Sequence, residues 1–179
     1  MKFSSTKVPG CYIVDIEPRG DDRGFFARQY CREEFLNQGI DPAIEQINIG
    51  LSERAGTLRG MHFQTAPYED TKFVRCLAGA IFDVCLDLRP ASATYLEWVG
   101  VELSAANRRS LYLPAGTAHG YLTLADNTEI MYTTNQAYAP DNAAGVRYDD
   151  TCFGIRWPRE VTTLSPADRE WPDFKPECT

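Results

Sequence analysis

Short segments with a two-residue hydrophobic period, separated by turn residues, recur through the middle of the chain. In residues 80–88 the even positions are all apolar, whereas the odd positions are mixed. This alternation is typical of a β-strand with one face in the core. The same pattern marks residues 10–16, 44–50, 57–63, 94–103, 110–113, 120–124 and 129–134. So many short strands predict an all-β fold, a jelly-roll sandwich or barrel with short peripheral helices.

Helices are expected in two places. Residues 32–38 carry helix-forming side chains and are followed by Gly39, a helix stop signal. A second helical turn is expected after Ser165, because serine caps helices and the proline that follows suits the first helical position. Residues 157–179 carry four prolines and are expected to wrap around the outside of the barrel. With no linker, repeat or low-complexity segment, residues 1–179 form one predicted domain.

The charge balance excludes two classes of partner. The chain has 18 Lys and Arg against 25 Asp and Glu, a net charge of −7. Nucleic acids and anionic membranes normally require a basic surface, so neither is expected as a partner. An anionic small ligand would have to be held by a few local Arg and Lys side chains.

The predicted compartment is the cytoplasm. No run approaches the ~18–20 apolar residues of a membrane span, and residues 1–10 lack the apolar core of a signal peptide. The six cysteines include no C-x-x-C pair, so zinc-ribbon and thioredoxin-like functions are not expected. Without a secretory signal, free thiols are favoured over disulfides.

Five segments carry candidate chemistry. They are 56–64 with Arg59 and His62, Lys72 before an apolar strand, 114–120 with His119, 129–138 with two tyrosines, and the turn at 21–24. On one continuous strand, tyrosines six positions apart would share a face. Taken singly, each segment also fits ordinary packing or a solvated turn.

A catalytic metal is not predicted. The chain has two histidines, 57 positions apart, and His62 has no H-x-H partner and no carboxylate within five residues on either side. Nothing in the sequence marks the additional ligands that a metal site needs.

Taken in order, the motifs resemble the dTDP-4-dehydrorhamnose 3,5-epimerase family, nucleotide-sugar epimerases of the RmlC-like cupin type. The resemblance runs from about Gly10 to about Asp168. Its pieces are Asp22-Arg-Gly-Phe-Phe26, Gln46-Ile-Asn48, Leu58-Arg-Gly-Met-His-Phe-Gln64, Lys72-Phe-Val-Arg75, the segment from Gly79 to Arg89, Pro114-Ala-Gly-Thr-Ala-His-Gly120, Tyr132 through Tyr138-Ala-Pro140, Gly154-Ile-Arg-Trp-Pro158, and Leu164-Ser165 through Asp168. Any one piece is weak evidence, but the ordered series is specific.

The resemblance implies an activity as well as a fold. It implies a cupin jelly roll, a homodimer, and metal-independent catalysis without a cofactor. The implied reaction inverts C3, or C3 and C5, of a nucleotide-linked 4-keto-6-deoxyhexose through an enolate. The implied partner is therefore a small nucleotide-diphosphate sugar, not a macromolecule.

By resemblance, four residues carry out the proton transfer. His62 is the base, and an imidazole titrates close enough to neutral pH to abstract a proton. Asp168 orients that histidine. Tyr132 is the acid that reprotonates the opposite face of the sugar. Lys72 lies beside the keto oxygen, where a cation offsets the negative charge that develops there.

Further positions match ligand contacts of the family. Arg23 and Arg59 match diphosphate-binding positions, and Tyr138 matches an aromatic that packs against the ligand. The other matched substrate-binding residues are Phe26, Gln46, Asn48 and His119. Arg28 is a further candidate substrate-binding residue, at a position where the family's residue differs. On an ideal strand Arg59 and His62 face opposite ways, so either Gly60 hosts a bulge or Arg59 serves the neighbouring subunit.

Three positions depart from the family pattern. Arg28 replaces a common glutamate, Ala143 replaces a second acid, and Ala167 replaces the lysine expected before Asp168. Thymine offers an N3–H donor to a glutamate, whereas cytosine offers an N3 acceptor to an arginine. One hypothesis is therefore that the substrate is a CDP-sugar and not a dTDP-sugar.

Two alternative functions remain open at the level of sequence. One is a sugar-nucleotide 3,4-ketoisomerase on the same scaffold, and the other is a cupin that binds a sugar nucleotide without catalysis. The presence of Lys72 and Tyr132 favours epimerisation over ketoisomerisation. The complete set of His62, Tyr132 and Asp168 argues against a pure binding protein, which needs no base and acid.

Overall fold

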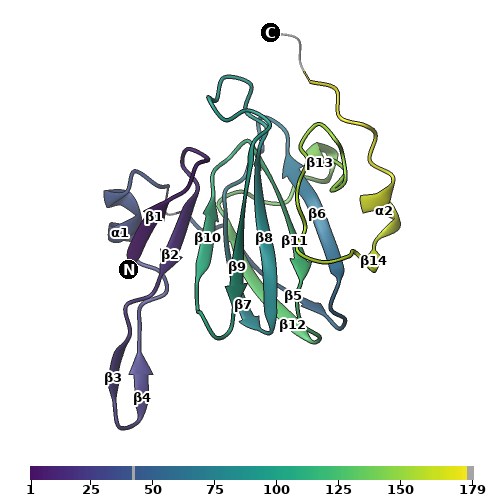
Figure 1. Ribbon diagram of the computed structural model, residues 1–179. Helices are drawn as coiled ribbons and strands as arrows, with labels where there is room; N and C mark the ends of the chain where they lie inside the picture. Colours follow the sequence, from purple (N-terminus) through teal and green to yellow (C-terminus); the bar gives the residue numbers. More distant parts are fainter. Residues whose placement is uncertain (42, 177–179) are drawn as a thin grey trace.

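The protein is a sandwich of two antiparallel β-sheets, which confirms the predicted jelly roll (Figure 1). The computed structural model describes residues 1–41 and 43–176. The first sheet contains, in spatial order, β1 (Lys2–Ser5), β2 (Tyr12–Asp15), β10 (Ser110–Leu113), β7 (Lys72–Ala78), β12 (Thr128–Thr134) and β5 (Gln46–Ser52). The second contains β13 (Ala143–Gly145), β6 (Thr57–Gln64), β11 (Thr117–Thr123), β8 (Ala80–Asp87) and β9 (Trp98–Ser104), with β14 (Thr163–Leu164) parallel to β6.

Apolar side chains are buried in three layers. The central layer lies between the sheets and includes Val74, Cys85 and Leu111. A second lies outside the first sheet, where Phe35 of α1 (Arg32–Asn37) packs on Phe73 with ring centroids 5.2 Å apart. The third layer lies outside the second sheet. Its buried residues are Met61, Val84, Leu86, Ala118, Val146 and Phe153.

The third layer corrects one expectation about residues 80–88. The even positions were expected to form the only core face, but β8 is buried on both faces. Val84 and Leu86 pack beneath the C-terminal segment that includes Phe153, whereas Ile81 and Cys85 face the layer between the sheets. An apolar alternation detects one face, and it does not show that a distant segment will cover the other.

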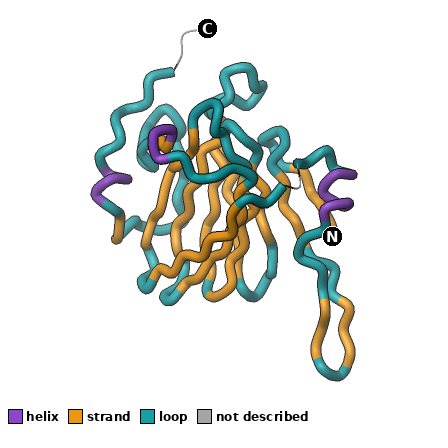
Figure 2. The backbone as a smooth tube through the Cα atoms, turned by 180° about the vertical axis from the view of Figure 1, so that it is seen from behind, coloured by secondary structure: helices purple, strands orange, loops and turns teal. Residues whose placement is uncertain are grey.

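The C-terminal segment runs along the outside of the sandwich beside β6, as predicted (Figures 1 and 2). Its helix α2 (Pro166–Arg169) begins where expected, because Ser165 Oγ accepts a hydrogen bond from the Asp168 N–H at 3.0 Å. Residues 177–179, including Cys178, lie outside the described residues. Five cysteines, Cys11, Cys31, Cys76, Cys85 and Cys152, are free thiols. Over the described ranges, no helix has the length and apolar character that crossing a membrane requires.

Several strand boundaries differ from the prediction. Residues 94–97 form a turn before β9, because the buried Asp87 carboxylate accepts hydrogen bonds from the hydroxyls of Ser92 at 2.6 Å and Thr94 at 2.7 Å. β11 begins at Thr117, three residues earlier than expected, and β5 begins at Gln46, two residues later. The short strands β1, β13 and β14 were not predicted.

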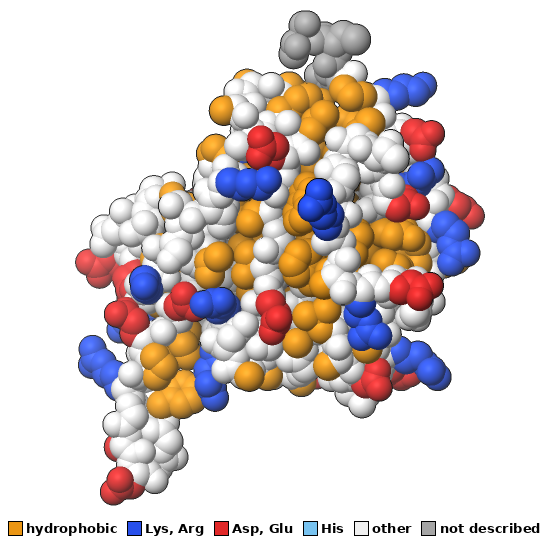
Figure 3. Space-filling model, in the orientation of Figure 1, with side chains coloured by type: hydrophobic (Ala, Val, Ile, Leu, Met, Phe, Trp, Pro, Cys, Tyr) orange, Lys and Arg blue, Asp and Glu red, His pale blue; other side chains and the backbone are white. Residues whose placement is uncertain are grey.

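A two-stranded hairpin projects from the body (Figure 1). It consists of β3 (Arg19–Asp21) and β4 (Gly24–Phe26), joined by the turn predicted at residues 21–24. Phe25 and Phe26 are 48% and 78% exposed. Figure 3 shows apolar atoms at the base of this projection and acidic side chains toward its tip.

Candidate active site

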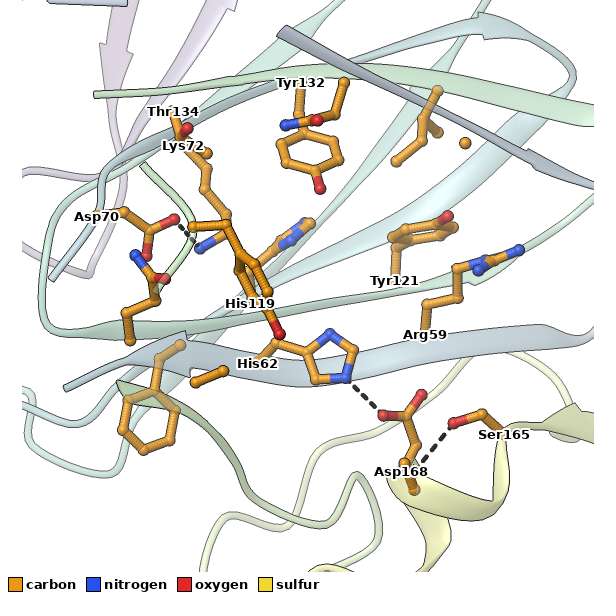
Figure 4. A pocket seen from close by; sticks show the side chains of 18 of the residues that line it. Arg59, His62, Asp70, Lys72, His119, Tyr121, Tyr132, Thr134, Ser165 and Asp168 are labelled. Atoms are coloured by element: carbon orange, nitrogen blue, oxygen red, sulfur yellow. Dashed lines mark hydrogen bonds and ion pairs between the residues drawn. The ribbon is translucent and has the colours of Figure 1, made fainter. Parts of the chain in front are cut away.

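A pocket of about 1010 Å³ opens between the two sheets. Strands β5, β7 and β12 form one wall, and strands β6 and β11 form the other (Figure 4). Residues from β13, β14, α2 and the loop after β12 also line the pocket, among them Ala143, Leu164, Asp168 and Tyr138. Clefts of this size with a few converging polar groups are typical of small-molecule sites.

Strand register places four predicted residues on the wall of the first sheet. Tyr132 of β12 is paired with Asn48 of β5. Two residues further along β12, Thr134 is paired with Gln46 of β5 and with Lys72 of β7. Cross-strand partners share a face of a sheet, and so do residues two apart on one strand. Gln46, Asn48, Lys72 and Tyr132 therefore line the same pocket.

A bulge brings Arg59 and His62 to the opposite wall. His119 of β11 is paired with His62, and Tyr121, two residues later, is paired with Arg59. Three steps along β6 thus match two steps along β11, and the register shift turns both side chains into the pocket. Gly60 within the bulge has φ +137°, a backbone conformation that favours glycine. This confirms the bulge at Gly60 as the explanation for the shared face.

Gly60→Ala is expected to unfold the site. A Cβ at this position would lie 2.4 Å from the Gly120 Cα, a backbone atom that has no freedom to rotate away. We expect a loss of about 3 kcal/mol or more in the free energy of unfolding, together with displaced Arg59 and His62 side chains. Thermal and denaturant unfolding measure the effect. The control is Gly39→Ala, at φ +72° with no atom within 4 Å of the added Cβ, which should cost about 1–2 kcal/mol; equal losses in both variants would contradict the steric argument.

His62 and Asp168 form the expected pair, although 106 positions separate them. The His62 Nε2 to Asp168 Oδ1 distance is 2.5 Å (Figure 4). Burial by itself would raise the pKa of Asp168, but contacts with His62, Ser165 and the Gly60 N–H hold it below its usual value. The carboxylate is therefore ionised at neutral pH. It can orient the imidazole and stabilise its protonated form.

Tyr132 and Lys72 face this pair from the other sheet. Burial and, second, the negative charge of Asp70 raise the pKa of Tyr132, whereas Arg59 acts in the opposite direction. The phenol therefore keeps its proton at neutral pH and has a proton to donate. The Lys72 Nζ lies 2.6 Å from the Asp70 carboxylate, and its side chain is 13% exposed.

His119 forms a second histidine–carboxylate pair on the wall of the second sheet. Its Nε2 lies 2.7 Å from Oδ1 of Asp83, a fully buried residue on β8. Burial raises the pKa of Asp83, and its Oδ2 has no hydrogen-bond partner in the described part of the chain. The His119 ring also lies against Tyr121, with ring centroids 6.1 Å apart.

Tyr138 reaches the pocket by a different route from the one expected. β12 ends at Thr134, so Tyr132 and Tyr138 are not on one continuous strand, and the shared-face argument does not apply to them. The loop is fixed instead by Gln64, which accepts a hydrogen bond from the Ala139 N–H at 2.7 Å and donates one to the Tyr68 carbonyl at 2.8 Å. Tyr138 is 66% exposed at the pocket.

Three predicted binding residues lie outside this pocket. Arg23 is on the projecting hairpin, where its 89% exposed side chain pairs with Asp21. Phe26 ends the same hairpin, and Arg28 pairs with Glu34 at 3.1 Å. Within one chain the structure does not bring them to His62 and Tyr132.

The pocket also contains residues that the sequence did not single out. Among them are Asp70, Tyr121 and Trp171, while Asp83 lies behind His119. Ser165, which the sequence predicted only as a helix cap, also lines the pocket. Asp70 is two positions from Lys72, and Tyr121 is two positions from His119. On an extended backbone residues two positions apart point to the same side, so this spacing could have identified both residues. Ala143 and Ala167, two of the positions that depart from the family pattern, do line the pocket. Within the described ranges, no group of three or more His, Cys, Asp or Glu is placed to hold a metal ion.

A jelly-roll sandwich with a histidine–carboxylate pair facing a tyrosine and a lysine is the arrangement of a cupin-type carbohydrate isomerase. The sequence model of a family described as dTDP-4-dehydrorhamnose 3,5-epimerase matches residues 5–176. The chain belongs to this family.

Individual relatives cover nearly the whole chain. A dTDP-4-dehydrorhamnose 3,5-epimerase from Sinorhizobium fredii is 39% identical over 97% of this chain and 90% of its own length. The Bacillus anthracis enzyme of the same name, solved with TDP and PPi bound, is 38% identical, with a TM-score of 0.93 over 97% of this chain and 99% of its own. A Legionella pneumophila 3,5-epimerase in complex with dTDP-4-keto-L-rhamnose has a TM-score of 0.87 at 34% identity, over 94% of this chain and 89% of its own.

Proposed function

We propose that the protein inverts C3, or C3 and C5, of a dTDP-linked 4-keto-6-deoxyhexose. The observation that carries the proposal is the placement of the His62–Asp168 pair opposite Tyr132 and Lys72 across one pocket. Epimerisation beside a ketone requires a base on one face of the sugar and an acid on the other. The substrate class follows from the ligands named for the Bacillus and Legionella relatives.

The proposed mechanism begins with His62. Its imidazole removes the proton from the carbon next to C4, and the electron pair of the broken C–H bond moves to the C4 oxygen as an enolate. The Lys72 ammonium offsets the charge on that oxygen. The Tyr132 hydroxyl then delivers a proton to the opposite face, which inverts the carbon and restores the ketone. Proton exchange with water returns His62 and Tyr132 to their starting states.

The remaining pocket residues are proposed to hold the nucleotide diphosphate. Arg59 is anchored by hydrogen bonds to the Leu51 carbonyl at 3.0 Å and the Ser52 hydroxyl at 3.3 Å. A guanidinium fixed in this way is suited to bind phosphate oxygens. We assign the other contacts to Gln46, Asn48, His119 and Tyr138.

A homodimer is proposed to complete the site. The hairpin carries Arg23 and Phe26 away from the pocket of its own chain, which fits a role in the pocket of a second copy. A surface for that copy is present on β5, where Ile47, Ile49 and Leu51 are 61%, 68% and 52% exposed on one face. Sedimentation equilibrium tests the proposal, and it fails if the mass stays that of one chain at micromolar concentration.

The identity of the nucleotide base is tested by measuring the binding of two nucleotides. Arg28 lies close to Phe26 near the hairpin, so the cytosine hypothesis now depends on the dimer. We compare the Kd of dTDP with that of CDP by calorimetry. The relatives favour dTDP, and a clear preference for CDP would instead support the cytosine hypothesis and change the substrate.

The reaction itself is tested by proton exchange in D2O, followed by NMR on both dTDP- and CDP-linked 4-keto-6-deoxyglucose. Deuterium at C3 alone identifies a mono-epimerase, and deuterium at C3 and C5 a double epimerase. Migration of the carbonyl from C4 to C3 would identify a 3,4-ketoisomerase. Binding without exchange would identify a non-catalytic cupin, and this result would refute the proposal.

The cytoplasm is the proposed compartment. The free thiols of Cys11, Cys31, Cys76, Cys85 and Cys152 support it, because a reducing cytoplasm maintains that state. Cell fractionation tests it, and recovery of the protein outside the cytoplasmic fraction would contradict it.

A further inference from the structure

Asp70 is a carboxylate of the pocket that the proposed mechanism does not use. It is 8% exposed and precedes β7, two positions before Lys72. Its Oδ2 accepts a hydrogen bond from the Lys72 Nζ at 2.6 Å, a charge-assisted contact between two side chains that are 6% and 13% exposed. Figure 4 shows this pair on the same side of the pocket as Tyr132.

From this geometry we infer that Asp70 is a positioning residue, which holds the Lys72 ammonium at the start of β7 and so sets the charge around Tyr132, the proposed acid. The inference rests on the proposed function, since it gives Tyr132 and Lys72 their roles. Asp70 would position Lys72 near the proposed acid, just as Asp168 positions His62, the proposed base.

The physical reason is the flexibility of lysine. Its ammonium is a point charge on a stem of four rotatable carbons, so a nearby carboxylate decides where it resides. Without that carboxylate, the Lys72 ammonium is free to approach the Tyr132 hydroxyl or the phosphates of a ligand. The pair also lies in a poorly solvated wall, where charges interact more strongly than in water.

Several elements contribute the charged and titratable groups around Tyr132. Asp70 precedes β7 and raises the pKa of Tyr132, whereas Arg59 of β6 lowers it, and Lys72 of β7 is held at Asp70. Tyr121 of β11 also interacts with Tyr132. Removing the Asp70 charge lowers the pKa of the phenol, and a released Lys72 ammonium lowers it further. Both effects have the same sign, so the protonated form of Tyr132 is lost at lower pH.

The first test needs no substrate. With ¹³C label at tyrosine Cζ, an NMR titration of the wild type and of Tyr132→Phe assigns the Tyr132 signal among the nine tyrosines. In Asp70→Asn this signal is expected to titrate at lower pH, and Asp70→Glu is expected to return it toward the wild-type position. An unchanged titration in Asp70→Asn would overturn the inference.

The second test is kinetic. Asp70→Asn is expected to lower kcat for inversion about tenfold, with KM changed less than about threefold, and to move the basic limb of the pH profile to lower pH. The matched control is Glu69→Gln, which removes the same charge from an exposed neighbour and should leave both unchanged. If Asp70 serves only stability, Asp70→Asn lowers the melting temperature and leaves the pH profile in place, which would also overturn the inference.

The two proposals fail separately. A wild type that exchanges no sugar proton refutes the proposed function, yet the tyrosine titration still reports whether Asp70 governs the charge at Tyr132. A wild type that exchanges normally, with a Tyr132 signal indifferent to Asp70, leaves the function intact and refutes the role of Asp70.

Discussion

His62→Ala is expected to abolish exchange of sugar protons with D2O, with a loss of at least about 10³-fold in rate. The enolate cannot form unless a base removes the proton, and in the proposed mechanism this base is the imidazole that Asp168 holds at 2.5 Å. The chain has one other histidine, His119, whose Nε2 contacts the buried Asp83. It therefore offers no substitute at the position of His62. NMR of the 4-keto sugar in D2O measures the rate.

The control for this variant is retained binding. The His62 side chain is 47% exposed, so its removal should leave the fold intact. Calorimetry should then give a Kd for dTDP within about threefold of the wild-type value. Asp168→Asn adds a second comparison, because it keeps the imidazole but removes the charge that orients it. We expect an intermediate loss of about 10²-fold. Exchange by His62→Ala within tenfold of the wild type would exclude His62 as the base.

The sandwich could be predicted from the chain because its strands alternate in polarity. The features that depend on contacts between residues far apart in the sequence could not be predicted. β8 is buried on both faces only because a segment beginning some 60 residues later covers Val84 and Leu86. Residues 94–97 have strand-like composition, yet the Asp87 carboxylate holds them in a turn. Edge strands such as β1 have few partners and a weak pattern, so periodicity does not detect them.

The candidate site divides in the same way. His62 and Arg59 stood out by residue type, but their common face depends on the bulge at Gly60, which the strand pattern suggested only as one of two options. Asp168 was supplied by the family resemblance, since no spacing rule links residues 106 positions apart. Asp70 was within reach of the sequence, because a residue two positions before Lys72 on extended backbone points to the same side. Trp171 had no local signal.

Tyr132→Phe is expected to separate exchange from inversion. Phenylalanine keeps the ring that fills the wall of the first sheet but lacks the hydroxyl that donates the proton in the proposed mechanism. His62 still forms the enolate and can return a deuteron to the face from which it took the proton. We therefore expect deuterium to enter the sugar at a rate within about tenfold of the wild type, while formation of the inverted product falls at least about 10²-fold. NMR in D2O reports both rates in one experiment, and Tyr148→Phe, outside the pocket, should change neither.

The pattern of failure identifies the alternative role. If exchange and inversion fall together in Tyr132→Phe, the hydroxyl acts before reprotonation, by stabilising the enolate oxygen together with Lys72. If inversion is unimpaired, the acid is another group, and Tyr121 is the next candidate because it also presents a phenol at the pocket. Burial raises the pKa of Tyr121, so it too is protonated at neutral pH. If Tyr121→Phe blocks inversion and Tyr132→Phe does not, the acid is Tyr121 of β11 and not Tyr132 of β12. Tyr121 lies on the same wall as His62. The sugar ring would then have to bind in a different orientation between the two sheets.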